Sequence, residues 1–80
     1  MIPNLITAEY VEKYIVNLTF ADNKVRTIDL EPELEGEVFE PLKDIDIFKS
    51  FIVRQEFGTI EWKNGADFAP EFLYGVDNAG

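Results

Sequence analysis

The strict alternation of side chains in residues 14–20 constrains the fold more than any other feature of the chain. In the stretch YIVNLTF, every second residue is large and mainly apolar, which is the pattern of a β-strand that buries one face. The residues that share this face are Tyr14, Val16, Leu18 and Phe20. We therefore expect a strand here, with these four side chains in the core.

Two further β-rich runs flank this strand. Residues 4–11 (NLITAEYV) precede it, and Glu12-Lys13 between the two runs is short enough for a tight turn. Residues 21–24 (ADNK) follow it and contain Asp and Asn, which tolerate left-handed backbone conformations, before residues 25–30 (VRTIDL) become extended again. The sequence thus predicts a three-stranded antiparallel meander.

The middle of the chain changes from strand to helical signals. Pro32 and Gly36 in EPELEG interrupt the sheet, because proline cannot donate to a ladder and glycine accepts a positive φ. Pro41 is compatible with the next segment only in the first turn of a helix. The apolar residues of this segment recur at helical spacing and are Val38, Phe39, Leu42 and Ile45.

A second helical turn and a second hairpin are expected next. Asp44 is a predicted N-cap for a short turn that would carry Ile47, Phe48 and Phe51 inward. Residues 51–55 (FIVRQ) and 59–62 (TIEW) again have strand character, and Gly58 between them is the expected left-handed residue.

The most distinctive stretch is WKNGADFAPEFLY, residues 62–74. Asn64-Gly65 predicts a type I′ turn in which both residues take a positive φ. Asp67 or Ala69 would then precede a last helical turn that begins with Pro70 and ends at Gly75. The side chains expected to close the core over the sheet are Phe68, Phe72, Leu73 and Tyr74.

These elements predict one α+β domain over residues 1–75, followed by a frayed tail at residues 76–80. Its parts would be the three-stranded antiparallel meander, short helical turns, a second β-hairpin and a C-terminal helical turn. With 80 residues, the domain can bury only a small hydrophobic core.

Charge is concentrated in one segment. The formal net charge is −9, and residues 29–40 contain no Lys or Arg. The acids of this segment are Asp29, Glu31, Glu33, Glu35, Glu37 and Glu40. They form either a solvated rim or a docking edge for a basic partner. A negative surface disfavours nucleic acid and anionic lipid.

Few residue types for catalysis are present. The chain has no His and no Cys, and its one serine, Ser50, lies at a predicted helix end. Asp44-Ile45-Asp46 begins like a calcium loop, but Lys49 and Gln55 stand where that loop needs Gly and Glu. We expect no enzyme activity, no cofactor and no metal.

Trp62 allows two interpretations, as a lid on the core or as an exposed anchor, and its alternation with Ile60 favours the core. The polar residues around it would serve as turns and caps, or as a rim that meets a partner. The predicted interaction residues are Glu31, Glu33, Glu35, Glu37, Trp62, Asn64, Asp67, Glu71 and Tyr74.

The motif W-x-N-G-A-D-x-A-P-E-F-L-Y, with Leu5 to Tyr10, Leu18 to Val25 and Leu34 to Asp44, resembles a bacterial family, domain of unknown function 2442. The likeness runs from about Met1 to Tyr74. It implies a small α+β domain without an established activity, of a kind often encoded beside a second small protein in toxin–antitoxin-like pairs. Some members carry an additional helix-turn-helix domain, for which these residues leave no room, so we expect no direct DNA binding.

Charge and resemblance together predict an acidic protein-interaction domain that acts like an antitoxin. Its expected partner is a basic protein, such as the product of a neighbouring gene. The alternative is a self-associating structural domain that forms a homodimer through an exposed sheet edge. The N-terminus lacks the features of a signal peptide, and no apolar stretch is long enough to span a membrane, so we expect a cytoplasmic protein.

Overall fold

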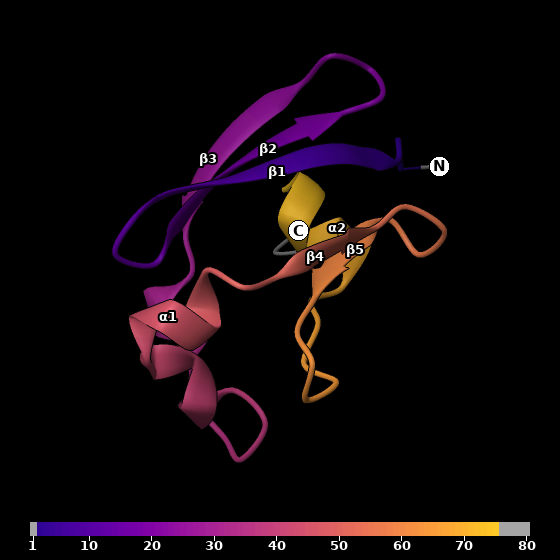
Figure 1. Cartoon of the computed structure of the whole chain (residues 1–80). Coiled ribbons are helices and arrows are strands. Elements are labelled where there is room, and N and C mark those ends of the chain that lie inside the picture. Colours follow the sequence, from indigo (N-terminus) through magenta and orange to yellow (C-terminus); the bar gives the residue numbers. More distant parts are fainter. Residues whose placement is uncertain (1, 76–80) are drawn as a thin grey trace, which may run out of the picture.

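Five short strands form two antiparallel sheets in this α+β protein (Figure 1). The computed structural model describes residues 2–75, and the predicted frayed tail lies outside the described residues. In chain order the elements are β1 (Leu5–Glu12), β2 (Ile15–Phe20), β3 (Val25–Asp29), the 3₁₀ turns η1 (Glu31–Glu33) and η2 (Glu40–Lys43), α1 (Ile45–Phe48), β4 (Ile52–Arg54), β5 (Thr59–Glu61) and α2 (Pro70–Tyr74).

The first sheet is the predicted meander, with β2 between β1 and β3. The alternation in β2 is confirmed, since Val16, Leu18 and Phe20 are buried. The turn before β2 lies one residue later than expected, at Lys13 and Tyr14, and Lys13 takes a φ of 50°. Tyr14 still faces the core, because its ring packs edge-on against a core phenylalanine.

The turn between β2 and β3 uses the Asp and Asn expected there. Asn23 adopts a left-handed φ of 72°, and Oδ1 of Asp22 accepts a hydrogen bond from the backbone N–H of Lys24 at 3.0 Å. The N–H of Phe20 closes the turn on the carbonyl of Lys24 at 2.9 Å. Local side-chain chemistry therefore fixes the point at which the chain reverses.

The segment between β3 and β4 forms short helical turns, as predicted. Pro32 and Pro41 both lie in the first positions of their 3₁₀ turns, where a missing N–H costs nothing. Asp44 is the predicted N-cap of α1, and its Oδ1 accepts from the backbone N–H of Asp46 at 2.9 Å.

Two side chains predicted to face inward from this segment do not. Val38 is 47% exposed and Ile47 is 42% exposed. The prediction assumed one continuous helical stripe, but η2 begins only at Glu40, so Val38 precedes it. In the four-residue helix α1, positions three apart share a face. Ile45 and Phe48 therefore turn toward the protein, while Ile47 turns away.

The second hairpin pairs β4 with β5 in the antiparallel sense, and the partner of Val53 is Ile60. Gly58 between the strands has the predicted left-handed φ of 69° and is itself buried. β5 is the more buried of the two strands, because Thr59 and Ile60 are buried whereas Ile52 of β4 is 55% exposed.

The last helix, α2, lies between the two sheets (Figure 1), and its C-terminal carbonyls bond to Arg26 of β3. Ala69 is its N-cap, Pro70 occupies the first turn, and Gly75 ends it with a φ of 91°, as predicted. No basic residue lies in its last turn. Two cations from elsewhere supply the positive charge that a helix C-terminus favours: Lys24 donates to the carbonyl of Tyr74, and Arg26 to the preceding carbonyls.

One hydrophobic core joins all these elements. Its side chains come from both sheets, from the helical turns and from the last motif of the sequence. The buried apolar residues are Leu5, Val16, Leu18, Phe20, Leu30, Leu34, Leu42, Phe48, Ile60, Trp62, Ala66, Phe68 and Leu73.

Candidate functional site

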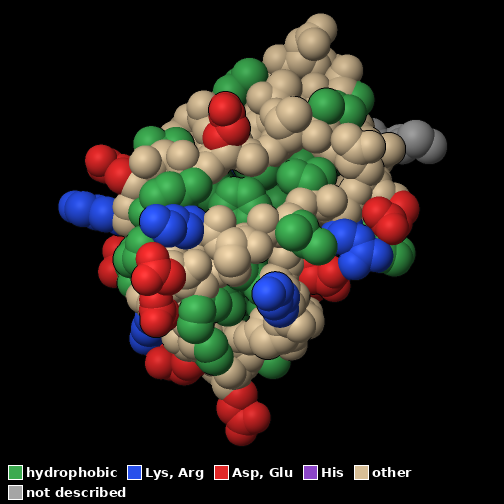
Figure 2. Space-filling model, viewed as in Figure 1, with side chains coloured by type: hydrophobic (Ala, Val, Ile, Leu, Met, Phe, Trp, Pro, Cys, Tyr) green, Lys and Arg blue, Asp and Glu red, His purple; other side chains and the backbone are tan. Residues whose placement is uncertain are grey.

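The most strongly charged surface is the acidic loop, which we define as residues 29–40. All six of its carboxylates are exposed. Figure 2 shows acidic side chains over the lower part of one face, where Figure 1 places the segment between β3 and α1. Glu40 forms an ion pair with Lys43 at 3.1 Å, and the other five carboxylates form none within residues 2–75. The loop therefore presents a nearly uncompensated negative charge.

The acidic loop is anchored at several points. Leu34 is completely buried, and the ring of Phe39 packs against that of Phe68 with 5.1 Å between centroids. Gly36 turns the chain with a φ of 93°, and its carbonyl accepts from the N–H of Glu40 at 2.8 Å. These contacts anchor the backbone of the loop, from which its exposed carboxylates project.

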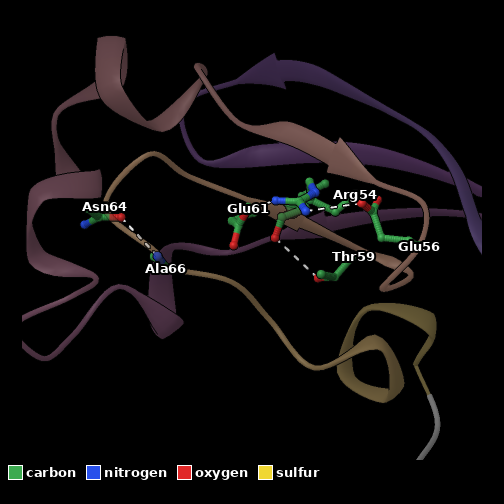
Figure 3. A network of polar contacts seen from close by, with 7 residues as sticks. Arg54, Glu56, Thr59, Glu61, Asn64 and Ala66 are labelled. Atoms are coloured by element: carbon green, nitrogen blue, oxygen red, sulfur yellow. Dashed lines mark hydrogen bonds and ion pairs between the residues drawn. The ribbon is translucent and has the colours of Figure 1, made fainter.

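Asn64 connects the acidic loop to the distinctive C-terminal motif. Its Nδ2 donates to the carbonyl of Val38 at 2.8 Å, across 26 residues of sequence. Its Oδ1 accepts from the backbone N–H of Ala66 at 3.1 Å, as Figure 3 shows. One amide side chain thus bonds both to its own turn and to the acidic loop.

The turn that carries Asn64 differs from the prediction. Only Gly65 takes a positive φ, of 90°, so the expected type I′ turn is wrong. Trp62 and Ala66 face each other across a three-residue loop, with the N–H of Trp62 bonded to the carbonyl of Ala66 at 2.9 Å. Loops of this length place a left-handed residue only at their last position. Asn64 therefore keeps an ordinary φ, and its side chain is free to bond outward.

Trp62 is a core residue, as its alternation with Ile60 favoured. It is 3% exposed, and its Nε1 donates to the carbonyl of Phe48 at 2.7 Å. Rings from three segments surround it, those of Phe48, Phe51 and Phe68. The structure thus places Trp62 in the core, and its inclusion among the interaction residues stays a prediction.

Tyr74 lies away from the acidic loop, at the C-terminal end of α2. Its hydroxyl donates to Oδ2 of Asp22, and its ring packs edge-on against Phe20 at 5.0 Å. The Nζ of Lys24 lies 4.0 Å from the ring centroid. The hydrogen bond from Tyr74 lowers the pKa of Asp22, and the same bond raises the pKa of Tyr74. Tyr74 thus connects α2 to the β2–β3 turn.

The remaining predicted residues are also dispersed. Asp67 is exposed and forms an isolated antiparallel bridge with Glu61 at the edge of β5. Glu71 is exposed in the first turn of α2 and lines an open cleft of about 540 Å³ together with Glu56. Of the predicted residues, the structure therefore brings together the four glutamates of the acidic loop and Asn64 alone.

A family model described as "Protein of unknown function (DUF2442)" matches residues 5–78. The chain belongs to this family. Neither the curated proteins nor the solved structures contain a significant match to it. The family match includes the whole of the acidic loop and of the C-terminal motif.

A polar network that the sequence did not reveal lies on the second hairpin of this DUF2442 domain. Arg54 contacts Glu61 through Nη1 at 2.5 Å and Glu56 through Nη2 at 3.2 Å (Figure 3). The hydrogen bond to Glu56 raises the pKa of Arg54, and the bond from Arg54 lowers the pKa of Glu56. The one basic residue of β4 and the one acidic residue of β5 were the available signal, since Arg54 pairs with Thr59 and Glu61 is its diagonal neighbour on the same side of the sheet.

Acidic clusters and buried polar side chains are few in the described part of the DUF2442 domain. Within residues 2–75, no three acidic side chains lie close enough to hold a metal ion. Thr59 is the one buried polar residue in that range, and its hydroxyl is occupied by the carbonyl of Phe68 at 2.6 Å. None of the helices in that range is long and apolar enough to cross a membrane.

Proposed function

We propose that this DUF2442 domain is a non-catalytic protein-interaction module that binds a basic protein surface through the acidic loop. In this role it would act as an antitoxin does, by covering the functional surface of its partner. The observation that carries the proposal is the set of five exposed carboxylates, Asp29 to Glu37, that have no ion-pair partner within residues 2–75.

The fixed shape of the acidic loop supports this function. A loop that must be ordered on binding loses conformational entropy, and this cost weakens the complex. Here Leu34, Phe39 and the bond from Asn64 to Val38 already hold the backbone in place. The charges are therefore presented by a surface that needs little reorganisation, which favours a specific complex over a diffuse ionic one.

Electrostatic attraction would determine how the complex forms. Six carboxylates lie within twelve consecutive residues of the acidic loop, and charges closer together than a Debye length of roughly 8–10 Å act together on an approaching cation. A net charge of −9 extends this attraction over the whole domain and repels nucleic acid. A partner that binds nucleic acid through a basic surface would be blocked by occlusion of that surface.

Two triple variants with the same net charge test the proposal. Replacing Glu33, Glu35 and Glu37 by Gln changes the charge from −9 to −6 within the acidic loop. The control replaces three exposed acids elsewhere, Glu9→Gln, Glu12→Gln and Asp46→Asn, and also gives −6. Any difference between the two variants then reports the position of the charge rather than its total.

Each variant is co-expressed with the neighbouring reading frame and captured by affinity at low and at high salt. We expect the native and control chains to retain the partner at low salt and to lose it at high salt. The loop variant should retain much less partner under both conditions. Equal recovery by the two triple variants, or recovery that does not depend on salt, would overturn docking through the acidic loop.

A further inference from the structure

Among the strand edges within residues 2–75, the outer edge of β3 is the least protected. β1 is interrupted by two register shifts, one between Leu5 and Thr7 and one between Tyr10 and Glu12. β4 has only three residues, and the outer side of β5 is bridged by Asp67. Irregular or very short edges resist pairing with another chain. β3, in contrast, has five residues in regular register with β2, and Figure 1 shows it at the outside of the meander.

The backbone groups that this edge presents follow from the register. The carbonyl of Lys24 accepts from the N–H of Phe20, and the N–H of Leu30 donates to the carbonyl of Tyr14, so even-numbered residues of this strand point toward β2. The direction alternates along a strand. The N–H and C=O groups of Val25, Thr27 and Asp29 therefore point outward, and nothing within residues 2–75 pairs with them.

Basic side chains commonly protect an edge strand, but those of β3 are engaged elsewhere. Nζ of Lys24 donates to the carbonyl of Tyr74 at 2.7 Å, and Nη1 of Arg26 donates to that of Phe72, also at 2.7 Å. Both cations thus bind the C-terminal end of α2, beneath the sheet. The outward N–H and C=O groups of Val25, Thr27 and Asp29 are therefore not shielded by a long basic side chain.

We propose that β3 pairs with β3 of a second copy of this chain, antiparallel and centred on Thr27. This register places Thr27 opposite Thr27 of the second copy, and Val25 opposite Asp29. The two three-stranded meanders then join into one continuous sheet, and every outward N–H and C=O of β3 gains a partner. The pairing is isologous, so it closes as a two-fold dimer and leaves no further β3 edge for a third chain.

The side chains on the outer face favour this orientation. Lys24 and Arg26 lie on the inner face, where they bind α2, so the side chains that meet on the outer face are Val25, Thr27 and Asp29. The antiparallel register sets Asp29 opposite the apolar Val25, whereas an in-register parallel pair would set Asp29 opposite Asp29 of the second copy. The edge therefore pairs with itself without facing like charges, although each chain has a net charge of −9.

The inference is independent of the docking function proposed for the acidic loop, and different variants test it. Thr27→Pro removes an N–H that points away from β2, so the ladder within the meander is kept while the intermolecular one is broken. Thr27→Lys places two like charges opposite each other at the two-fold axis, and Thr27→Glu does the same with the opposite sign. An equal mixture of the Lys and Glu variants restores the attraction.

Two control variants distinguish the effect of the β3 backbone edge from the effects of the Thr27 side chain and of added charge. The hydroxyl of Thr27 donates to Oδ1 of Asn17 on the outer face of the sheet. Thr27→Val removes this bond and leaves the backbone edge intact. Thr7→Lys adds the same charge to an exposed position of β1, which is the opposite edge strand of the meander.

Sedimentation equilibrium of the full chain at concentrations up to roughly 1 mM measures the association. We expect a reversible dimer for the native chain and for Thr27→Val and Thr7→Lys. Thr27→Pro should raise the dissociation constant about thirtyfold, the factor for the loss of two hydrogen bonds of roughly 1 kcal/mol each. Thr27→Lys and Thr27→Glu should each weaken the dimer by roughly fivefold alone and recover it when mixed.

Several outcomes would overturn the proposal. A native chain that stays monomeric at the highest concentration has no such pairing. If the Thr27→Pro variant dimerises as strongly as the native chain, the dimer uses another surface. The same conclusion follows if mixing the Thr27→Lys and Thr27→Glu variants does not restore the dimer. Far-ultraviolet circular dichroism establishes that each variant is folded, and if the proline variant is not, the Lys and Glu variants decide the matter.

Discussion

The hydroxyl of Tyr74 donates a hydrogen bond to Asp22 across 52 residues of sequence, and so joins the last helix to the first sheet. Because this bond lowers the pKa of Asp22 below its ordinary value of 3.8, the folded state favours the ionised carboxylate. The resulting stabilisation is present above pH 3.8 and is lost as the pH falls through the lowered pKa. The pKa of Tyr74 is raised above 10.0, so its contribution is present below pH 10 and is lost as the pH rises further.

Asp22→Asn should therefore lower the melting temperature at neutral pH, because the bond to Tyr74 loses its charge while Oδ1 can still accept from the N–H of Lys24. The difference from the native chain should shrink below pH 3.8. Thermal melts over a series of pH values measure this. Glu9→Gln is the control, since Glu9 is exposed and forms no ion pair within residues 2–75. A difference that is the same at acid and at neutral pH would contradict the assignment.

Trp62→Phe should destabilise the fold without exposing a new binding surface. The change removes ring volume from the core and leaves the carbonyl of Phe48 without its donor. We expect a loss of about 2–4 kcal/mol in the free energy of unfolding, measured by urea denaturation. Phe57→Leu is the matched control, because Phe57 is 61% exposed and its replacement should cost under about 0.5 kcal/mol. Equal effects of the two variants would show that Trp62 is not enclosed.

Gly75→Ala and Gly36→Ala separate backbone strain from steric contact. Both glycines have a φ near 90°, so alanine is strained at either position by roughly 1–2 kcal/mol. An added Cβ at Gly36 meets nothing within 4 Å, whereas at Gly75 it would lie 3.1 Å from Nε of Arg26. Chemical denaturation should therefore show a larger loss for Gly75→Ala. A smaller loss at Gly75 would mean that Arg26 does not hold the end of α2.

Asn64→Asp should loosen the acidic loop. The carboxylate keeps an acceptor for the N–H of Ala66 but loses the donor to the carbonyl of Val38, and it adds a charge beside like charges. The amides of Phe39 and Glu40, which bond to the carbonyl of Gly36, should then exchange with solvent faster. Hydrogen exchange measures this, and Lys63→Ala at the adjacent exposed position is the control. Unchanged exchange at Phe39 and Glu40 would show that Asn64 does not support the loop.

The parts of the fold that the sequence predicted correctly are those set by neighbouring residues. The alternation of β2, the N-cap of Asp44 and the left-handed glycines at 58 and 75 each follow from a few adjacent positions. The placement of Trp62 in the core also followed from alternation. In all these cases, the preference of the local backbone and the requirement for a buried face agree.

The features that could not be predicted depend on residues far apart in the chain. The type I′ turn at Asn64 was a reasonable local expectation, but a three-residue loop frees its amide for Val38, 26 residues away. Likewise, nothing beside Lys24 or Arg26 indicates that they bind α2. The one hint in the sequence is that the last turn of α2 contains no basic residue, which leaves its C-terminal carbonyls available to cations from other segments.

For the candidate site, the sequence revealed the charge of the acidic loop but not its shape. The positions of its carboxylates depend on the burial of Leu34 and on the packing of Phe39 against Phe68. These are tertiary contacts with no local signature. The same reason explains why Glu71 and Tyr74, which are close to Asn64 in sequence, lie apart from the loop in space.

The binding of Lys24 and Arg26 to the carbonyls of residues 72–74 has a consequence for synthesis. During translation, the meander is made before the helix whose C-terminal carbonyls it binds. A nascent chain that stalls before residue 70 would lack this helix, and the ring of Phe20 and the guanidinium of Arg26 would stay open to the chaperones of the cell. The bonds of Lys24 and Arg26 to α2 can therefore form only after the strands and the other helical turns of residues 2–75 have been synthesised.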